Sequence, residues 1–266
     1  MSDLILEQRD GPVLTLTLNR PEKRNPISDP DMIDALCAAL ERADADLDVR
    51  CVVLTGAGSA FSSGGDIGKM KPGLGLRAHL PAQTRRNYKA GIQRLPLLFE
   101  GLEVPIVAAV NGPAIGAGLD LACMCDVRVA ATSAKFAESF VKIGIVPGDG
   151  GAWLLPRIIG FSKASELALT GDLIDAEEGK AIGLVSRVVP DADLLGEAAA
   201  IAGRIAANPP HAVRMTKRLL REAQGMTLKA VLEMSAAYQS LAHATEDHDE
   251  AVNAFVEKRK PLFGGR

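Results

Sequence analysis

Little in this chain of 266 residues suggests binding to nucleic acid or insertion into a membrane. Lysine and arginine number 30 against 33 acidic residues, so the net charge of −3 gives no overall basic surface. No uncharged apolar stretch reaches 18 residues, and the start MSDLILEQRD lacks the basic and apolar regions of a signal peptide. We therefore expect a cytoplasmic protein with no nucleic-acid or membrane partner.

Cysteine and histidine are also scarce. The four cysteines are Cys37, Cys51, Cys123 and Cys125. The four histidines are His79, His211, His243 and His248. No CxxC or HxxxH pair occurs, so we expect reduced core cysteines, no metal site and no separate cofactor.

Several catalytic motifs are missing as well. The chain has no GxxxxGK[ST] phosphate loop, no GxGxxG dinucleotide fingerprint and no GxSxG nucleophile elbow. A serine hydrolase using Ser62 or Ser63 would need a histidine partner, and every histidine is distant in sequence. With 47% hydrophobic and 24% charged residues, the composition is that of a globular protein with one main domain plus an appendage.

Two apolar runs end in glycine-rich turns, and these turns carry the most information. They are CVVLTGAGSAFSSGGDI at residues 51–67 and VPIVAAVNGPAIGAGLDLA at residues 104–122. Each is typical of a buried strand followed by a loop that can start a helix, where the first backbone N–H groups lack intrahelical partners. Two such donors directed at one point form an oxyanion hole, although either turn alone could be an ordinary tight turn.

The order and spacing of further motifs resemble the crotonase superfamily of enoyl-CoA hydratases and isomerases. The motifs are LNRPEKRNPIS (18–28), FSSGGDI (61–67), AAVNGPAIGAGLDLACMCDVRVA (108–130), KFAESFVKIGIVPGDGGAWLLPRIIG (135–160), LTGDLIDAEEGKAIGLVSRVV (169–189) and AFVEKRKPLF (254–263). The resemblance implies an α/β fold, a spiral of ββα units with two roughly perpendicular sheets. It also implies a core at residues 1–190 and a C-terminal helical oligomerisation region at 191–266, giving a homotrimer or a dimer of trimers.

Periodicity predicts the individual elements. A hairpin is expected within residues 4–18, a helix at 28–47, strands at 51–55, 106–110 and 126–131, a mobile loop at 71–83, and a helix at 84–102 disturbed at Pro96. Three further helices are expected at 191–207, 211–224 and 227–255. An apolar stripe on the last, from Val231 to Ala244, is explained first by core packing.

The resemblance assigns the two oxyanion donors to the amides of Gly65 and Ala117. Many hydratases of the superfamily also carry two glutamates, which correspond here to Asp120 and Phe140. Asp120 is therefore a candidate acid or base, with helix capping as its alternative role. The second glutamate is absent.

Glu138 and Asp149 are the candidates to replace it. Glu138 precedes Phe140 by two residues, so their side chains point the same way in an extended segment and diverge in a helical one. Asp149 lies in VPGDGG, where an Asx-turn is the alternative explanation, and some isomerases of the superfamily use an aspartate one position earlier. Asp66 is expected to stabilise its loop.

Residues expected to contact the acyl-CoA thioester come from both turns and from the chain ends. They are Lys23, Arg24, Ser63, Gly64, Asp66, Ile67, Gly116, Phe140, Trp153 and Lys258. Lys258 would come from a neighbouring subunit, and Phe140, Trp153 and the loop at 74–80 would shape the acyl pocket. Core packing of the aromatic residues and solvation of the lysine are the alternatives.

The expected function is addition of water to a 2-enoyl-CoA in fatty acid metabolism. A thioester carbonyl held by two N–H groups can accept charge as the α-carbon loses a proton or as a nucleophile adds at the β-carbon, and the position of the acid or base then selects the reaction. Double-bond isomerisation ranks almost level with hydration. An acyl-CoA hydrolase of the same fold and a non-catalytic RNA-binding module are further alternatives.

Overall fold

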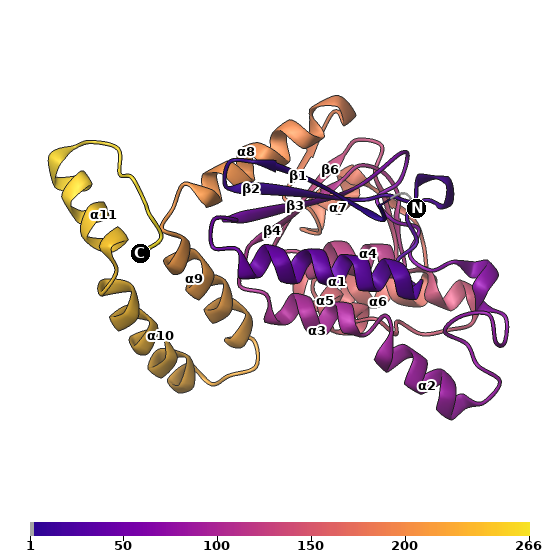
Figure 1. Cartoon of the computed structure of the whole chain (residues 1–266). Coiled ribbons are helices and arrows are strands. Elements are labelled where there is room, and N and C mark those ends of the chain that lie inside the picture. Colours follow the sequence, from indigo (N-terminus) through magenta and orange to yellow (C-terminus); the bar gives the residue numbers. More distant parts are fainter. Residues whose placement is uncertain (1–2) are drawn as a thin grey trace.

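A mostly parallel sheet of six strands forms the centre of the molecule in the computed structural model, which describes residues 3–266 (Figure 1). The expected region 1–190 thus begins with two residues outside the described part. In spatial order the strands are β1 (Ile5–Asp10), β2 (Val13–Leu18), β3 (Cys51–Gly56), β4 (Ile106–Val110), β6 (Val127–Ala131) and β9 (Arg187–Val189). Only the β1–β2 hairpin is antiparallel, as the short connection at Gly11 and Pro12 requires.

A second sheet of three short strands lies beside the first. Its strands are β5 (Ala114–Ile115), β7 (Lys135–Ala137) and β8 (Ile174–Asp175), in the order β5, β7, β8. Ser62 forms an isolated parallel bridge to Ala114, which connects the first glycine-rich turn to the second. The expected α/β fold with two sheets and C-terminal helices is confirmed.

Side chains alternate between the two faces of the large sheet and build two cores. On β3, Val52 and Leu54 join the larger core, whereas Cys51 and Val53 point to the opposite face. The larger core packs against α1 (Pro30–Ala45), α3 (Arg94–Gly101) and α4 (Ala117–Met124). The smaller core packs against α8 (Leu194–Ala206). Because both faces are covered, the central strands are apolar throughout.

Further helices complete the periphery. They are α2 (Pro81–Ala90), α5 (Gly151–Ile159), α6 (Phe161–Thr170) and α7 (Ala176–Ala181), with 3-10 segments at Pro21–Lys23, Ile67–Met70, Ser139–Ile143 and Asp191–Asp193. The prediction of one helix at 84–102 was wrong, because the chain breaks between α2 and α3 at Gly91. Pro96 lies in the first turn of α3, where its missing N–H needs no partner.

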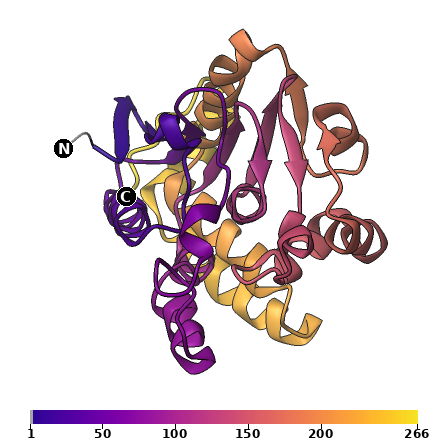
Figure 2. The same ribbon diagram turned by 90° about the vertical axis from the view of Figure 1, so that its right-hand side faces the viewer.

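Three helices at the C-terminus lie to one side of the core in Figure 1 and behind it in Figure 2. They are α9 (Pro210–Glu222), α10 (Leu228–His243) and α11 (Glu246–Glu257). The single helix expected at 227–255 is divided, because Thr245 accepts a hydrogen bond from the His248 amide and caps α11. No residue of α10 is buried, so its apolar stripe is not part of a core within the described chain.

Buried cations attach α9 to the core. Lys217 donates to the Val104 carbonyl at 2.6 Å and pairs with Asp126 at 2.9 Å. Arg214 donates to Asp44 and to the Val49 carbonyl. Burial lowers the pKa of Lys217.

No helix between residues 3 and 266 is long and apolar enough to cross a membrane.

Asn25 positions the first glycine-rich turn. It adopts the left-handed conformation, with φ of 53°, and its side chain is fully buried. Its Nδ2 donates to the carbonyls of Ala57 and Ala60, both at 2.9 Å, and its Oδ1 accepts from the Arg20 amide. Its own carbonyl accepts from the Ser62 hydroxyl. One buried amide thus connects the segment after β2 to the segment after β3.

We expect the substitution Asn25→Ala to lower the free energy of unfolding by about 2 to 4 kcal/mol, because it leaves several buried backbone groups without partners. Urea unfolding measures this loss. The matched control Asn253→Ala removes an exposed asparagine of α11, and its effect should stay within about 0.5 kcal/mol. Equal stability of the two variants would contradict the role given to Asn25.

Candidate active site

The two glycine-rich turns lie in direct contact. Gly64 has φ of 79°, and a Cβ there would stand 2.4 Å from the Ile115 carbonyl oxygen and 3.0 Å from the Ala117 nitrogen. A Cβ on Gly118 would stand 2.2 Å from the Ser62 carbonyl oxygen. Only glycine permits this approach, because real side chains cannot occupy such distances. The turns predicted separately from the sequence therefore form one site.

The amides of Gly65 and Ala117 lie on these adjoining turns, and neither donates a hydrogen bond to an acceptor within residues 3–266. Ala117 is the first residue of α4, so its N–H has no intrahelical partner. The amides on both sides of Gly65 are occupied, since Gly64 donates to the Ser62 hydroxyl and Asp66 to the Ser28 hydroxyl. The Gly65 and Ala117 amides are thus both available to a ligand.

Asp120, Glu138 and Asp149 form a buried group of carboxyls beside these turns. Their exposed fractions are 0%, 1% and 3%. The Gly151 amide, at the start of α5, donates to Asp120 Oδ2 at 3.1 Å. A Cβ on Gly151 would lie 2.2 Å from Asp120 Oδ1 and 2.4 Å from Glu138 Oε1, so both carboxyls converge on one point. The sequence proposed these acids one by one, and the structure brings them together.

Burial keeps this group partly protonated. It raises the pKa of Asp149 to about 6, and together with the Asp149 charge it raises the pKa of Glu138 to about 8. Burial and the charges of Glu138 and Asp149 raise the pKa of Asp120 well above its usual value. Near neutral pH the group therefore contains carboxylic acids beside a carboxylate, which can give and take protons.

Four oxygens of this group have no hydrogen-bond partner within the described chain. They are Asp120 Oδ1, both Glu138 carboxyl oxygens and Asp149 Oδ1. Buried polar atoms without partners are costly, so they are typical of sites where a ligand completes the hydrogen bonding. Within residues 3–266 no three His, Cys, Asp or Glu side chains are arranged to hold a metal ion.

Glu138 and Phe140 contact different neighbours. Residues Ser139–Ile143 form a 3-10 helix, so the extended alternative, in which both side chains point the same way, does not apply. The Phe140 ring lies against Gly116, 3.5 Å from where its Cβ would stand, while Glu138 reaches Gly151. Phe140 thus adjoins the second turn, and Glu138 belongs to the carboxyl group.

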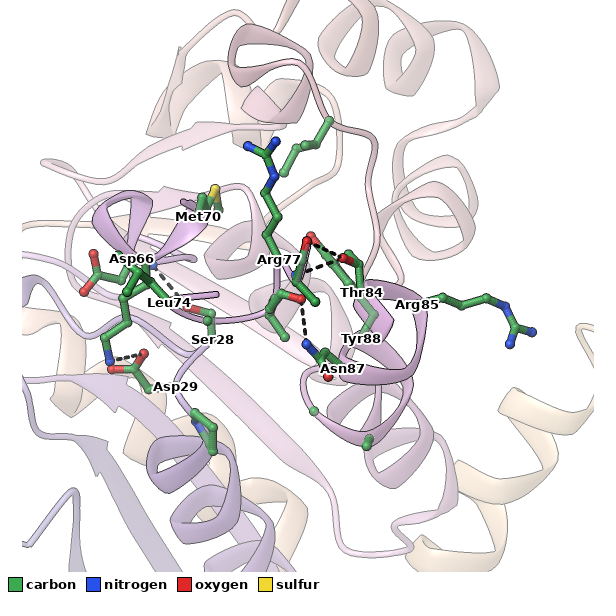
Figure 3. Close-up of a pocket in the computed structure, with 18 of the residues that line it drawn as sticks. Ser28, Asp29, Asp66, Met70, Leu74, Arg77, Thr84, Arg85, Asn87 and Tyr88 are labelled. Carbon is green, nitrogen blue, oxygen red and sulfur yellow. Dashed lines mark hydrogen bonds and ion pairs between the residues drawn. The ribbon is translucent and has the colours of Figure 1, made fainter. Parts of the chain in front are cut away.

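A cavity of about 1180 Å³ is lined by residues of the loop after the first turn and of α2, among them Met70, Leu74 and Tyr88 (Figure 3). Met70 marks one end, because its Cε lies 2.8 Å from where a Cβ on Gly65 would stand. Tyr88 marks another, because its ring lies 2.9 Å from the equivalent point on Gly148. The Asp149 charge contributes, after burial, to the raised pKa of Tyr88. The cavity therefore lies beside Gly65 and Gly148, whereas Gly65, Ala117, Asp120, Glu138 and Asp149 are not among the residues that line it.

The loop at residues 74–79, which forms part of the cavity wall, is fixed to α2. Asn87 donates to the Leu76 carbonyl at 3.0 Å, and the Thr84 hydroxyl accepts from the Ala78 amide at 2.9 Å (Figure 3). Met70, Tyr88 and Asn87 were not identified from the sequence. The loop has no periodicity, and only the fold brings these side chains to the site. Gly151 was also missed, although PGDGG is itself a motif of close backbone approach.

The other expected contact residues are distributed more widely. Asp66 lines the cavity, accepts from the Gly68 amide and pairs with Lys23 at 3.5 Å. Arg24 is joined through its carbonyl to the Ser63 amide. Trp153 is not at the cavity, since it lies under the Arg157 guanidinium, 4.0 Å from the ring centroid, and lines a second cavity of about 650 Å³. Lys258 is exposed at the end of α11.

Unused amides and buried carboxyls in a two-sheet α/β fold are features of an enzyme active site, and sequence comparison identifies the family. The family model described as enoyl-CoA hydratase/isomerase matches residues 8–266. The chain therefore belongs to the enoyl-CoA hydratase/isomerase family of the crotonase superfamily. As an enzyme of this family it acts on acyl-CoA thioesters.

Individual relatives are similar over their full length. A 1,2-epoxyphenylacetyl-CoA isomerase of Escherichia coli is 38% identical over 268 residues, with 100% of both chains covered. A 2,3-dehydroadipyl-CoA hydratase of the same species is 38% identical over 266 residues, again with 100% of both covered. The crystal structure of an enoyl-CoA hydratase from Bacillus anthracis superimposes with a TM-score of 0.92 at 34% identity, covering 99% of this chain and 100% of that one.

We expect Glu138→Gln to make the protein less sensitive to rising pH. Below its ordinary pKa of 4.5 the Glu138 carboxyl is protonated both folded and unfolded. Between that value and about 8 the unfolded chain releases the proton while the folded protein keeps it, so rising pH favours the unfolded state of wild type. The stability of the variant relative to wild type should therefore increase by about 2 kcal/mol or more between about pH 5 and pH 8.

Urea unfolding across this pH range measures the difference. Glu233→Gln, at an exposed glutamate of α10, is the matched control and should show no such trend. A difference between Glu138→Gln and wild type that does not change with pH would contradict the raised pKa.

Proposed function

We propose that the protein is an enoyl-CoA hydratase, which adds water across the double bond of a 2-enoyl-CoA. The buried group of Asp120, Glu138 and Asp149 carries this proposal. Hydration needs a base that takes a proton from water and an acid that delivers a proton to the α-carbon. A group that holds both protonation states near neutral pH can supply both.

The unused amides of Gly65 and Ala117 suit the thioester carbonyl. In the proposed reaction, a carboxylate of the buried group removes a proton from water as the water oxygen bonds to the β-carbon. Electrons of the double bond move onto the carbonyl oxygen, and the two N–H groups stabilise the resulting negative charge. A neighbouring carboxylic acid then protonates the α-carbon, and the product is a 3-hydroxyacyl-CoA.

Double-bond isomerisation is the second candidate. It requires only that one group move a proton between the α- and γ-carbons, through the same enolate. Two observations favour it: Phe140 occupies the position of a glutamate in many hydratases, and one relative of 38% identity is named an isomerase. Asp149, whose pKa is raised to about 6, suits a reversible base near neutral pH.

The expected oligomer is part of the proposal. Leu232, Leu241, Phe255 and Val256 on α10 and α11 are large apolar side chains exposed by more than half. Such a surface is typical of a subunit interface, which supports assembly through residues 191–266 as a trimer or a dimer of trimers. Lys258 would then lie close to a neighbouring subunit, where it could meet CoA.

We expect Ala117→Pro to lower turnover of an enoyl-CoA by at least about 100-fold, because it removes one of the two donors. Proline is well tolerated at the first position of a helix, so α4 should persist. Ala117→Gly, which keeps the N–H, is the control and should retain most activity. Near-normal turnover by the proline variant would exclude Ala117 from the oxyanion hole.

Reaction in deuterated water with short and medium 2-enoyl-CoAs distinguishes the two candidates. Hydration predicts a 3-hydroxyacyl-CoA with one α-deuterium, and Asp120→Asn and Glu138→Gln should each lower its rate at least about 100-fold. Asp249→Asn, at an exposed aspartate of α11, is the control. A product with a shifted double bond and no hydroxyl would replace hydration by isomerisation.

A further inference from the structure

Every acidic side chain in the wall of the large cavity is neutralised by a cation. Asp29 pairs with Arg20 at 2.7 Å and with Lys69 at 2.8 Å. Asp34 pairs with Arg94, and Asp66 pairs with Lys23. These acids therefore add no net negative charge to the wall.

Two arginines of the same wall have no such partner. Within residues 3–266, neither Arg77 nor Arg85 forms an ion pair, and the side chain of neither donates a hydrogen bond to the protein. In Figure 3 the Arg77 side chain stands between Met70 and the α2 residues Thr84 and Tyr88, whereas the Arg85 side chain points away from the other labelled residues. Arg77 is thus the free cation placed to meet a ligand in the cavity.

The cavity wall that includes Arg77 also includes side chains that adjoin the proposed thioester site. Met70 and Ser28 line the cavity and are also the nearest side chains to Gly65. Tyr88 lines it and adjoins Gly148, next to Asp149. The same wall includes Leu74, Leu76 and Ile145, which suit a hydrocarbon chain.

We propose that Arg77 recognises a carboxylate at the far end of the acyl chain, so that the preferred substrates are 2-enoyl-CoA thioesters of dicarboxylic acids. A guanidinium can bind a carboxylate through two parallel hydrogen bonds, which selects both charge and direction. Hydrogen bonds from the Ala78 amide to Thr84 and from Asn87 to the Leu76 carbonyl hold the backbone on both sides of Arg77 against α2. This inference rests on the proposed enoyl-CoA chemistry and adds its substrate class.

The decisive experiment compares matched thioesters that differ only in the terminal group. We expect wild type to show at least about 10-fold higher kcat/KM for 2-hexenedioyl-CoA than for 2-hexenoyl-CoA. Arg77→Gln should lose this preference while retaining its rate on 2-hexenoyl-CoA, and Arg77→Lys should keep part of it. The preference should shrink in high salt, because Arg77 is exposed.

Arg86→Gln, on α2 but outside the cavity wall, is the matched control and should behave as wild type on both thioesters. Equal kcat/KM of wild type for the two thioesters would overturn the proposal. An equal loss on both thioesters in Arg77→Gln would also overturn it, and would assign Arg77 to the CoA phosphates or to loop structure.

A binding measurement separates this inference from the proposed reaction. Calorimetry with the saturated thioesters adipyl-CoA and hexanoyl-CoA needs no turnover. Tighter binding of adipyl-CoA that depends on Arg77 supports carboxylate recognition even if no enoyl-CoA is converted. Conversion of 2-hexenoyl-CoA without any preference for adipyl-CoA in binding leaves the reaction in place and rejects the role of Arg77.

Discussion

The site depends on contact between two stretches of backbone with no side chain between them. Gly64 and Gly118 occupy positions where a single Cβ would overlap a carbonyl of the opposite turn. The parallel bridge between Ser62 and Ala114 continues this contact into the second sheet. The free amides of Gly65 and Ala117 are therefore carried on rigid, hydrogen-bonded segments, which is what preorganised charge stabilisation requires.

The carboxyl group beside them reduces the stability of the fold. Asp120, Glu138 and Asp149 are almost entirely buried, and several of their oxygens lack partners in the described chain. Burial opposes ionisation, so their raised pKa values and their stability cost have the same origin. Buried ionisable groups with raised pKa values are typical of catalytic sites, where their position serves a reaction and not the stability of the fold.

Local patterns in the sequence were sufficient for the turns and for the individual acids. Glycine-rich segments after apolar strands indicated the two turns, and the superfamily resemblance indicated Gly65, Ala117 and Asp120 within or beside them. Whether Glu138 or Asp149 replaced the missing glutamate could not be decided from sequence. Both approach Asp120 in the structure, and this proximity depends on how β7 and the start of α5 pack around α4.

Other features depend on tertiary context. The loop at 74–80 was expected to shape the acyl pocket, but it has no repeating pattern, so its sequence did not indicate that Arg77 and Tyr88 line the same cavity. The break at Gly91 was masked by the helical pattern on both sides of it. Thr245 is a recognisable cap, yet the apolar stripe from Val231 to Ala244 that leads up to it favoured one long helix. At Gly91 and at Thr245, a helical pattern thus outweighed a single residue that ends an element.

The contacts of Asn25 between the segment after β2 and the segment after β3 also affect when the site can form during synthesis. Its side chain bonds to residues 57–61, the first turn then meets the second near Gly116, and Gly151 is needed to hold Asp120. These contacts are all distant along the chain, and such topologies order slowly. A growing polypeptide on the ribosome therefore lacks a complete reaction centre until Gly151 has emerged, whatever structure its earlier strands have already acquired.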